Sequence, residues 1–263
     1  MDFFFVFFLF GLLIGSFLNV LVYRLKDAET LLGRSFCRKC KHQIRWYDNI
    51  PLISFVLLRG ECRDCQEKIS WQYPVLECVT GLLFGLVGFF FFDPLVTASY
   101  TETVWLLITI SSILVVAVYD MRHMEIPMVM LFVSAFFTFL FLLETFFSFP
   151  EPFFSSRLFF GLSGGLVVAG FFFLLVWMSH ETWMGFGDVW LGLLCGLIVG
   201  LPLVLPMLTL SFGIGAIVGL TLIAWGKKGM KSQMPFAPFL VFGTLLILFL
   251  PKIFPVLSQF LFV

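Results

Sequence analysis

The strongest constraint on the fold of this chain is a series of long apolar runs. A helix needs about 20 such residues to cross a bilayer. The runs lie at residues 3–23, 74–92, 103–120, 126–148, 157–178, 188–203, 204–225 and 236–254. Hydrophobic residues make up 60% of the 263 and charged residues only 12%, against about 25% charged in soluble domains. The sequence therefore predicts an all-α polytopic membrane protein with about eight transmembrane helices.

Two of these runs need comment. The division between 188–203 and 204–225 is the weakest, because Pro202 and Pro206 fit either a tight turn or a kink in one helix. The first run lacks a basic flank and a clear small-residue cleavage site, and it is longer than the apolar part of a signal peptide. We expect it to be a retained helix.

The distribution of basic residues predicts the orientation. Residues 24–71 hold ten of the sixteen Lys and Arg side chains. If this loop is cytoplasmic, Arg122 and the lysines at 227, 228 and 231 are also inside, and only Arg157 and Lys252 are outside. The positive-inside rule then places the N-terminus outside. Asp120 and Asp188 then fall at the cytoplasmic ends of their runs.

The polar loop 24–71 carries two CxxC pairs separated by twenty-one residues. The four cysteines are Cys37, Cys40, Cys62 and Cys65. Paired CxxC turns are typical of tetrahedral zinc, and a site closed by four thiolates is structural rather than catalytic. Disulfides are the alternative, which a reducing cytoplasm disfavours. We expect a small zinc-binding loop domain that resembles a zinc ribbon, while Cys78 and Cys195 are expected to be inert buried thiols.

Two aspartates lie at the ends of apolar runs, where a charge is costly. Asp120 ends the run from Trp105, and Asp188 follows Gly185-Phe186-Gly187. A carboxylate at mid-bilayer costs about 2.5–3.5 kcal/mol on insertion scales, so such residues are functional candidates. Ordinary explanations exist: Asp120 could be an interfacial acid paired with Arg122, and Asp188 could cap a helix. The two glycines favour a site, because they let another backbone approach closely.

Together the two aspartates suggest an aspartyl protease. Two facing carboxylates share one proton; the ionised one takes a proton from water, and the protonated one donates to the scissile carbonyl oxygen. The chain shows no histidine pattern typical of a metal site and no serine nucleophile elbow. Pro235 and Pro238, in a Pro-Phe-Ala-Pro segment before the last run, lie at the same predicted depth and are candidates for shaping a substrate groove.

These motifs resemble those of the bacterial type IV prepilin peptidases, which are aspartyl proteases of the GxGD type. The resemblance covers nearly the whole chain, in order. In the amino-terminal region it rests on GSFLNVLVYRL at 15–25, the CxxC pairs around WYDNIPL at 46–52, RGECRDC at 59–65 and ISWQYPVLE at 69–77. In the peptidase region it rests on Tyr-Asp at 119–120 with Ile-Pro at 126–127, GFGDVWL at 185–191 and PFAPFL at 235–240.

The resemblance implies a function and two cofactors. Family members cleave the leader of prepilins or pseudopilins on the cytoplasmic side, after a glycine, with the catalytic pair at the positions of Asp120 and Asp188. Many also methylate the new N-terminus with S-adenosylmethionine, for which the sequence itself shows no binding motif. This chain departs from the family at Met128, where Asp is common, and at Trp190, where Lys is usual.

The resemblance also implies a division into an amino-terminal region, residues 1–95, and a six-helix peptidase region, residues 96–263. The expected partners are prepilin or pseudopilin substrates and membrane lipid, with no nucleic acid. The expected location is the bacterial inner membrane, with the active site at its cytoplasmic face. Three alternatives stay open: a presenilin-like intramembrane protease, a transporter that uses the aspartates as an ion relay, and a pseudoenzyme acting in assembly. Presenilin-like proteases generally have no CxxC loop, and a transporter would have no role for one. The two intact aspartates argue against a pseudoenzyme.

A final expectation concerns the substrate. The mature helix of a prepilin should lie against the peptidase helices, and its basic leader should extend over the cytoplasmic face. Its candidate acidic partners are Asp48, Glu61, Asp64, Glu67 and Glu77. Because the loop holds ten bases against six acids, leader recognition would depend on local placement rather than on bulk charge.

Overall fold

The computed structural model describes residues 2–27, 33–148, 152–226, 229 and 233–253. Within these ranges every long element is a helix, and the only bridges are two isolated antiparallel pairs. The lysines at 227, 228 and 231, used above for orientation, lie outside the described residues. The chain divides into two compact units, Met1–Thr103 and Val104–Val263, which are described separately. The predicted domain boundary after residue 95 falls in the connection before the third long helix, Thr97–His123, and stays a prediction.

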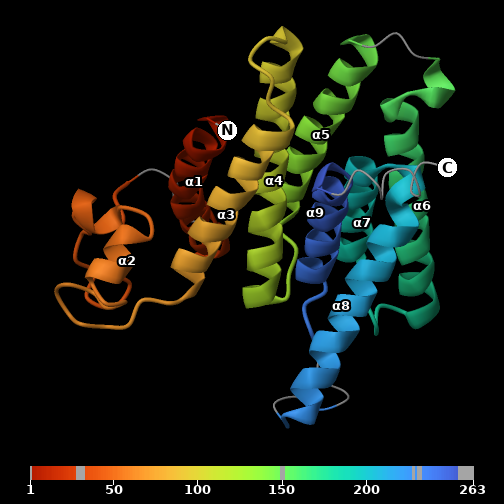
Figure 1. Ribbon diagram of the computed structural model, residues 1–263. Coiled ribbons are helices and arrows are strands. Elements are labelled where there is room, and N and C mark those ends of the chain that lie inside the picture. The colour runs from red at the N-terminus through yellow and green to blue at the C-terminus, as the bar shows by residue number, and fades with distance from the viewer. Residues whose placement is uncertain (1, 28–32, 149–151, 227–228, 230–232, 254–263) are drawn as a thin grey trace. The chain divides into compact units, whose positions relative to one another are not determined.

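The first unit is built on two long apolar helices, α1 (Asp2–Asp27) and α3 (Gln72–Phe90), which lie side by side (Figure 1). Small residues allow this close approach. A Cβ atom added at Gly15 would come within 2.7 Å of the Glu77 Cα, and one at Gly11 within 2.9 Å of the Gly81 Cα. Glycine at such crossings is a common way to pack membrane helices, because it lets two backbones come into contact.

The segment between α1 and α3 contains two similar turns and two short helices. The bridge Phe36–Gln43 encloses the first CxxC pair, and the bridge Glu61–Lys68 encloses the second. Between the two turns lie η1 (Trp46–Asn49) and α2 (Ile53–Leu57). This is the expected ribbon-like arrangement, and the longer spacing between the pairs is taken up by η1 and α2.

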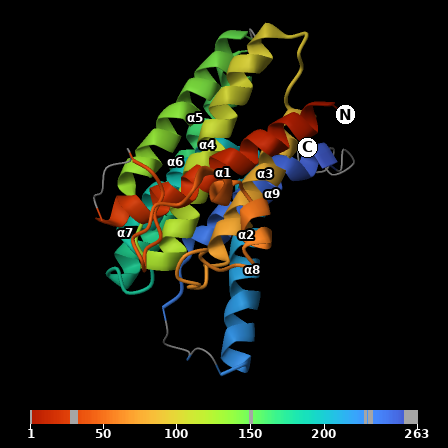
Figure 2. The ribbon, with the colours of Figure 1, turned by 90° about the vertical axis from the view of Figure 1, so that its left-hand side faces the viewer.

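The second unit contains most of α4 (Thr97–His123), then α5 (Met128–Ser148), α6 (Arg157–Ser179), α7 (Phe186–Val199), α8 (Val204–Ala224) and α9 (Ala237–Ile253). One-turn helices η2 (Phe153–Ser155) and η3 (Leu201–Leu203) precede α6 and α8. In both ribbon views α4 runs beside α5 (Figures 1 and 2). Helix α6 packs along α7, and α8 along α9.

Hydrogen bonds join α4 to α5. The Trp105 indole N–H donates to Glu144 at 2.8 Å near one end, and the hydroxyls of Thr109 and Thr138 lie 3.2 Å apart further along. Such side-chain bonds between apolar helices satisfy polar groups that lipid cannot hydrate. They fix α5 antiparallel to α4, so that Glu144 lies far along α4 from Asp120.

Within the part of the chain that the structure describes, six helices are long and apolar enough to cross a membrane: α1, α3, α4, α5, α6 and the segment Leu201–Ala224. The chain is thus a multi-pass membrane protein, but the predicted count of eight spans is not confirmed. The other two predicted spans, 188–203 and 236–254, correspond to α7, with 14 residues, and α9, with 17, which is fewer than the usual 20 or so. The predicted separation of 188–203 from 204–225 is confirmed, because α7 ends just before Gly200. Gly200 has a φ of +79°, which suits glycine.

Candidate active site and metal centre

Asp120 lies in the last turn of α4 and is buried, with 6% of its surface exposed. Its Oδ2 accepts a hydrogen bond of 3.0 Å from the backbone N–H of Ala237, the first residue of α9. The first N–H groups of a helix have no partner inside it, and the helix dipole makes this end positive. A carboxylate bonded there is stabilised in its ionised form.

The Pro-Phe-Ala-Pro segment therefore contributes more than its prolines. Ala237 supplies the donor to Asp120 and is fully buried. The preceding Phe236 packs against Phe212 of α8 and Phe172 of α6, with ring centroids 5.0 and 5.8 Å apart. Pro235 and Pro238 flank this anchored pair. The sequence analysis missed Ala237; its position at a predicted helix start, just before a proline that lacks an N–H, was the available signal.

Asp188 is the third residue of α7, and its Oδ2 accepts a hydrogen bond of 3.2 Å from the N–H of Gly185. The capping explanation is therefore partly right: Asp188 is not the N-cap itself but bonds back to it. Its carboxylate also interacts electrostatically with that of Asp120. Each aspartate thus lies at the N-terminal end of a short helix, α9 for Asp120 and α7 for Asp188, and these two helices pack against each other.

The two glycines of the GxGD segment have different surroundings. A Cβ atom at Gly187 would lie 3.2 Å from the side chain of Ile126, in the connection between α4 and α5. A Cβ atom at Gly185 would meet nothing within 4 Å among the described residues. Gly187 thus admits a neighbouring segment of the protein, whereas Gly185 faces open space beside Asp188. Of the two glycines, Gly185 therefore leaves space for a substrate.

The two departures from the family pattern lie in the same unit. Met128 is the first residue of α5, and Trp190 lies two residues after Asp188 in α7. Each exposes 38% of its surface, and Trp190 packs edge-on against Phe132 with ring centroids 6.2 Å apart. A Trp–Phe pair on α7 and α5 therefore stands where a lysine would have placed a charge.

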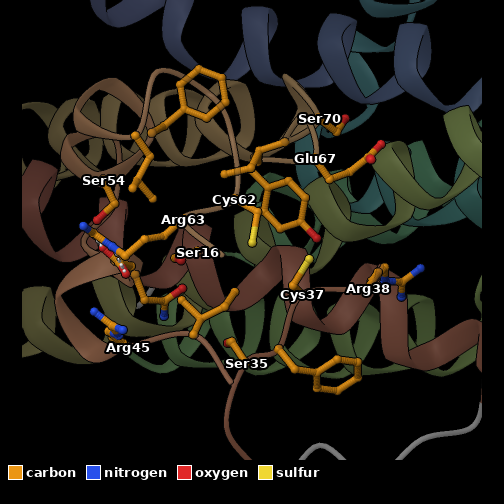
Figure 3. A pocket seen from close by; sticks show the side chains of 18 of the residues that line it. Ser16, Ser35, Cys37, Arg38, Arg45, Ser54, Cys62, Arg63, Glu67 and Ser70 are labelled. Atoms are coloured by element: carbon orange, nitrogen blue, oxygen red, sulfur yellow. Dashed lines mark hydrogen bonds and ion pairs between the residues drawn. The ribbon is translucent and has the colours of Figure 1, made fainter. Parts of the chain in front are cut away.

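The four cysteines of the loop form one cluster, in which all ligand atoms lie within 4.8 Å of one another. The Sγ atoms of Cys37 and Cys65 are 3.7 Å apart. Four sulfurs at about 2.3 Å from a tetrahedral zinc lie about 3.8 Å from each other. The cluster therefore fits a tetrahedral metal ion, and Figure 3 shows the Cys37 and Cys62 side chains pointing toward each other.

The two turns that present these thiols share one geometry. The N–H of Cys37 donates to His42 O and that of Lys41 to Cys37 O; in the second turn the N–H of Cys62 donates to Glu67 O and that of Gln66 to Cys62 O. Lys41 and Gln66 both have left-handed backbones, with φ of 59° and 56°. An ion pair between Lys39 and Glu67 joins the turns.

The pKa values of the thiols also favour a cation. Although burial opposes it, hydrogen bonds from the backbone at Cys40 and Lys39 lower the pKa of Cys37 to about 7. At Cys65 a hydrogen bond from the Glu67 backbone lowers the pKa, but burial and the three neighbouring thiols raise it to about 12. Four thiols this close cannot all ionise unless a positive ion joins them.

Comparison with known proteins supports both regions. A family model described as the bacterial peptidase A24 N-terminal domain matches residues 9–91, and one described as the type IV leader peptidase family matches residues 107–220. No solved structure matches the chain.

Three similar proteins are named prepilin leader peptidase/N-methyltransferase. The one from Bacillus subtilis is 30% identical over 245 residues, 92% of this chain and 92% of its own. The one from Pseudomonas aeruginosa is 29% identical over 256 residues, 88% of this chain and 85% of its own. The one from Myxococcus xanthus is 32% identical over 233 residues, 86% of this chain and 65% of its own. With a relative aligned almost end to end and both models in the expected order, the chain belongs to the type IV leader peptidase family.

Proposed function

We propose that this protein is a membrane aspartyl endopeptidase that removes the leader of type IV prepilins or pseudopilins, cutting after a glycine at the cytoplasmic face. The observation that carries the proposal is the placement of Asp120 and Asp188 at the N-terminal ends of two helices that pack together. The names of its relatives supply the substrate class.

The chemistry follows from this placement. The two carboxylates share one proton, because their charges repel at short range. The ionised carboxylate takes a proton from a water molecule, which attacks the scissile carbonyl carbon. The protonated carboxylate donates its proton to the carbonyl oxygen, which gives a tetrahedral adduct. The other carboxylate then passes the proton taken from water to the amide nitrogen, the C–N bond breaks to release the amine of the mature pilin, and the proton on the former carbonyl oxygen returns to the dyad. The open space at Gly185 allows an extended peptide to reach Asp188.

We further propose that the four cysteines hold one structural zinc ion and that the protein methylates the amine it has released. S-adenosylmethionine, when bound, supplies a methyl group to the neutral amine, and its sulfonium sulfur keeps the electron pair of the broken bond. The protein must remove a proton from the ammonium before this attack. The fit of the thiols to a tetrahedral ion supports the zinc, and the names of the relatives support the methyl transfer.

Substitution of the dyad tests the peptidase proposal. Asp120→Asn and Asp188→Asn each keep the size of the side chain but remove the shared proton chemistry. We expect purified protein with either change to lose all measurable cleavage of a prepilin, while its melting temperature stays close to that of the wild type.

A matched control is Glu144→Gln, because Glu144 bonds to Trp105, fifteen residues and about 22 Å along α4 from Asp120. It should cleave normally. Cleavage by both aspartate variants would contradict the proposal and favour an ion relay. Cleavage within the transmembrane segment of the substrate, instead of at the leader, would favour the presenilin-like alternative.

A further inference from the structure

A pocket in the first unit has no assigned role in peptide cleavage. It has a volume of about 580 Å³ and lies between the cysteine loop and the helices α1 and α3. Cavities of about 300–1,000 Å³ accommodate small-molecule ligands and cofactors. We propose that this pocket binds the methyl donor, S-adenosylmethionine; the inference rests on the methyltransferase part of the proposed function.

The first argument concerns the metal cluster, which forms part of the wall. Cys37 and Cys62 both line the pocket, and Figure 3 shows their sulfur atoms near its middle. Four thiolates around a divalent ion carry a net charge of −2. A sulfonium cation placed beside them is attracted, whereas an anionic ligand is repelled. The zinc would thus support the site by its charge, without an open coordination position.

The second argument concerns Glu77, which lines the pocket and exposes only 6% of its surface. Its Oε2 accepts a hydrogen bond of 2.9 Å from the N–H of Leu52, and Ser16 bonds to the same carboxylate. Leu52 has a left-handed backbone, with φ of 59°. A buried carboxylate and a strained backbone cluster at ligand sites more often than elsewhere. Glu77 is therefore a buried carboxyl group held in place at the wall of the cavity.

The third argument concerns the rest of the wall. The rings of Tyr23 and Tyr73 are stacked with centroids 5.4 Å apart and line the pocket together with apolar side chains such as Ile50 and Phe55. The Arg38 guanidinium already lies over the Tyr23 ring, 3.8 Å from its centroid, so this part of the wall suits a purine base through its apolar side chains. Asp48, held by two hydrogen bonds of 2.6 and 2.8 Å from Arg63, adds a second fixed carboxylate.

The other candidate occupant is the basic leader of the substrate. Six Lys or Arg side chains and four Asp or Glu side chains line the pocket. This excess of positive charge disfavours a basic peptide. A zwitterionic nucleoside with an additional sulfonium charge can use both the carboxylates and the cations, so the observations favour the methyl donor.

The test measures binding separately from activity. Full-length protein in nanodiscs is checked for one zinc per chain, and S-adenosylmethionine is titrated by calorimetry. Glu77→Gln keeps an acceptor for the Leu52 N–H but removes the charge. Ile50→Trp fills the pocket from an exposed position. The control, Glu61→Gln, removes the same charge from a residue of the loop that does not line the pocket.

We expect Glu77→Gln and Ile50→Trp to weaken the binding of S-adenosylmethionine about tenfold or more, with zinc content unchanged, and Glu61→Gln to bind it as the wild type does. Wild-type affinity in both pocket variants, in a protein that methylates, would overturn the location but leave the proposed function standing. A raised KM for prepilin with unchanged binding would assign the pocket to the leader. A wild type that cleaves but neither binds nor methylates would overturn both the methyltransferase proposal and this site.

Discussion

At the scale of single residues, the site depends on which groups touch each aspartate. Asp120 bonds to a backbone N–H of another helix, and Asp188 bonds to the N–H at the start of its own helix. Neither bond requires a particular side chain on the donor. The two glycines near Asp188 differ: a side chain at Gly187 would contact Ile126, whereas Gly185 borders open space.

This difference gives a paired prediction. Gly187→Ala should reduce kcat/KM for prepilin cleavage at least about tenfold, since its methyl group presses on Ile126 and shifts the start of α7 with Asp188. Its melting temperature should change little, because alanine also favours the helix. Adding Ile126→Ala removes two of the three contacting atoms and should restore part of the rate. Undiminished cleavage by the single variant would show that this contact does not position Asp188.

Gly185→Ala serves as the comparison. The added methyl group meets no described atom, so the fold and melting temperature should be unchanged. Any rise in KM then reports a clash with substrate rather than with the protein.

At the scale of elements, the start of α9 is the feature that prepares Asp120. Phe236 anchors the segment on α6 and α8, and the next residue presents its N–H to the carboxylate. A bond of this kind to a charged group contributes about 1.5–3 kcal/mol.

Ala237→Pro removes that donor at a helix position where proline is well tolerated. We expect cleavage to fall about ten- to a hundredfold. Ala237→Ser, which keeps the N–H, should cleave at nearly the wild-type rate. Circular dichroism checks that helix content is retained. Equal rates for the two variants would mean that the bond from Ala237 has no part in catalysis.

The start of α9 also shows which features could be predicted from the sequence and which could not. The long apolar runs predicted eight spans, and six of the corresponding helices are long enough to cross a bilayer within the described residues. The CxxC spacing predicted the cysteine cluster, because each pair occupies one tight turn. The Ala237 donor was not predicted. The sequence indicates a helix start before a proline, but it does not show which group accepts the hydrogen bond, because that partner is 117 residues away. The pocket escaped too, because α1, α3 and the loop each supply only part of its wall.

At the scale of the whole molecule, function requires that the dyad and the cysteine loop face the same compartment. The positive-inside argument places both in the cytoplasm and the connection from α3 to α4 outside. Two exposed residues suit a test of this orientation: Leu95, 92% exposed in that connection, and Trp46, 75% exposed in the loop.

In intact bacteria a membrane-impermeant maleimide should label Leu95→Cys, whereas Trp46→Cys should react only after the membrane is permeabilised. Labelling of the wild type measures the background from the native cysteines. The reverse pattern would place the dyad outside and would contradict cleavage at the cytoplasmic face.

Within the described residues, the two helices that fall short of spanning length are both next to the dyad: α7 carries Asp188, and the first N–H of α9 bonds to Asp120. Helix α7 has 14 residues and α9 has 17, about 21 and 26 Å at 1.5 Å per residue, against about 30 Å of hydrocarbon. Such hydrophobic mismatch is relieved by thinning the bilayer around the short segments. A local dip in the membrane would carry the aqueous boundary down to the dyad, so that hydrolytic water arrives without a channel through the protein.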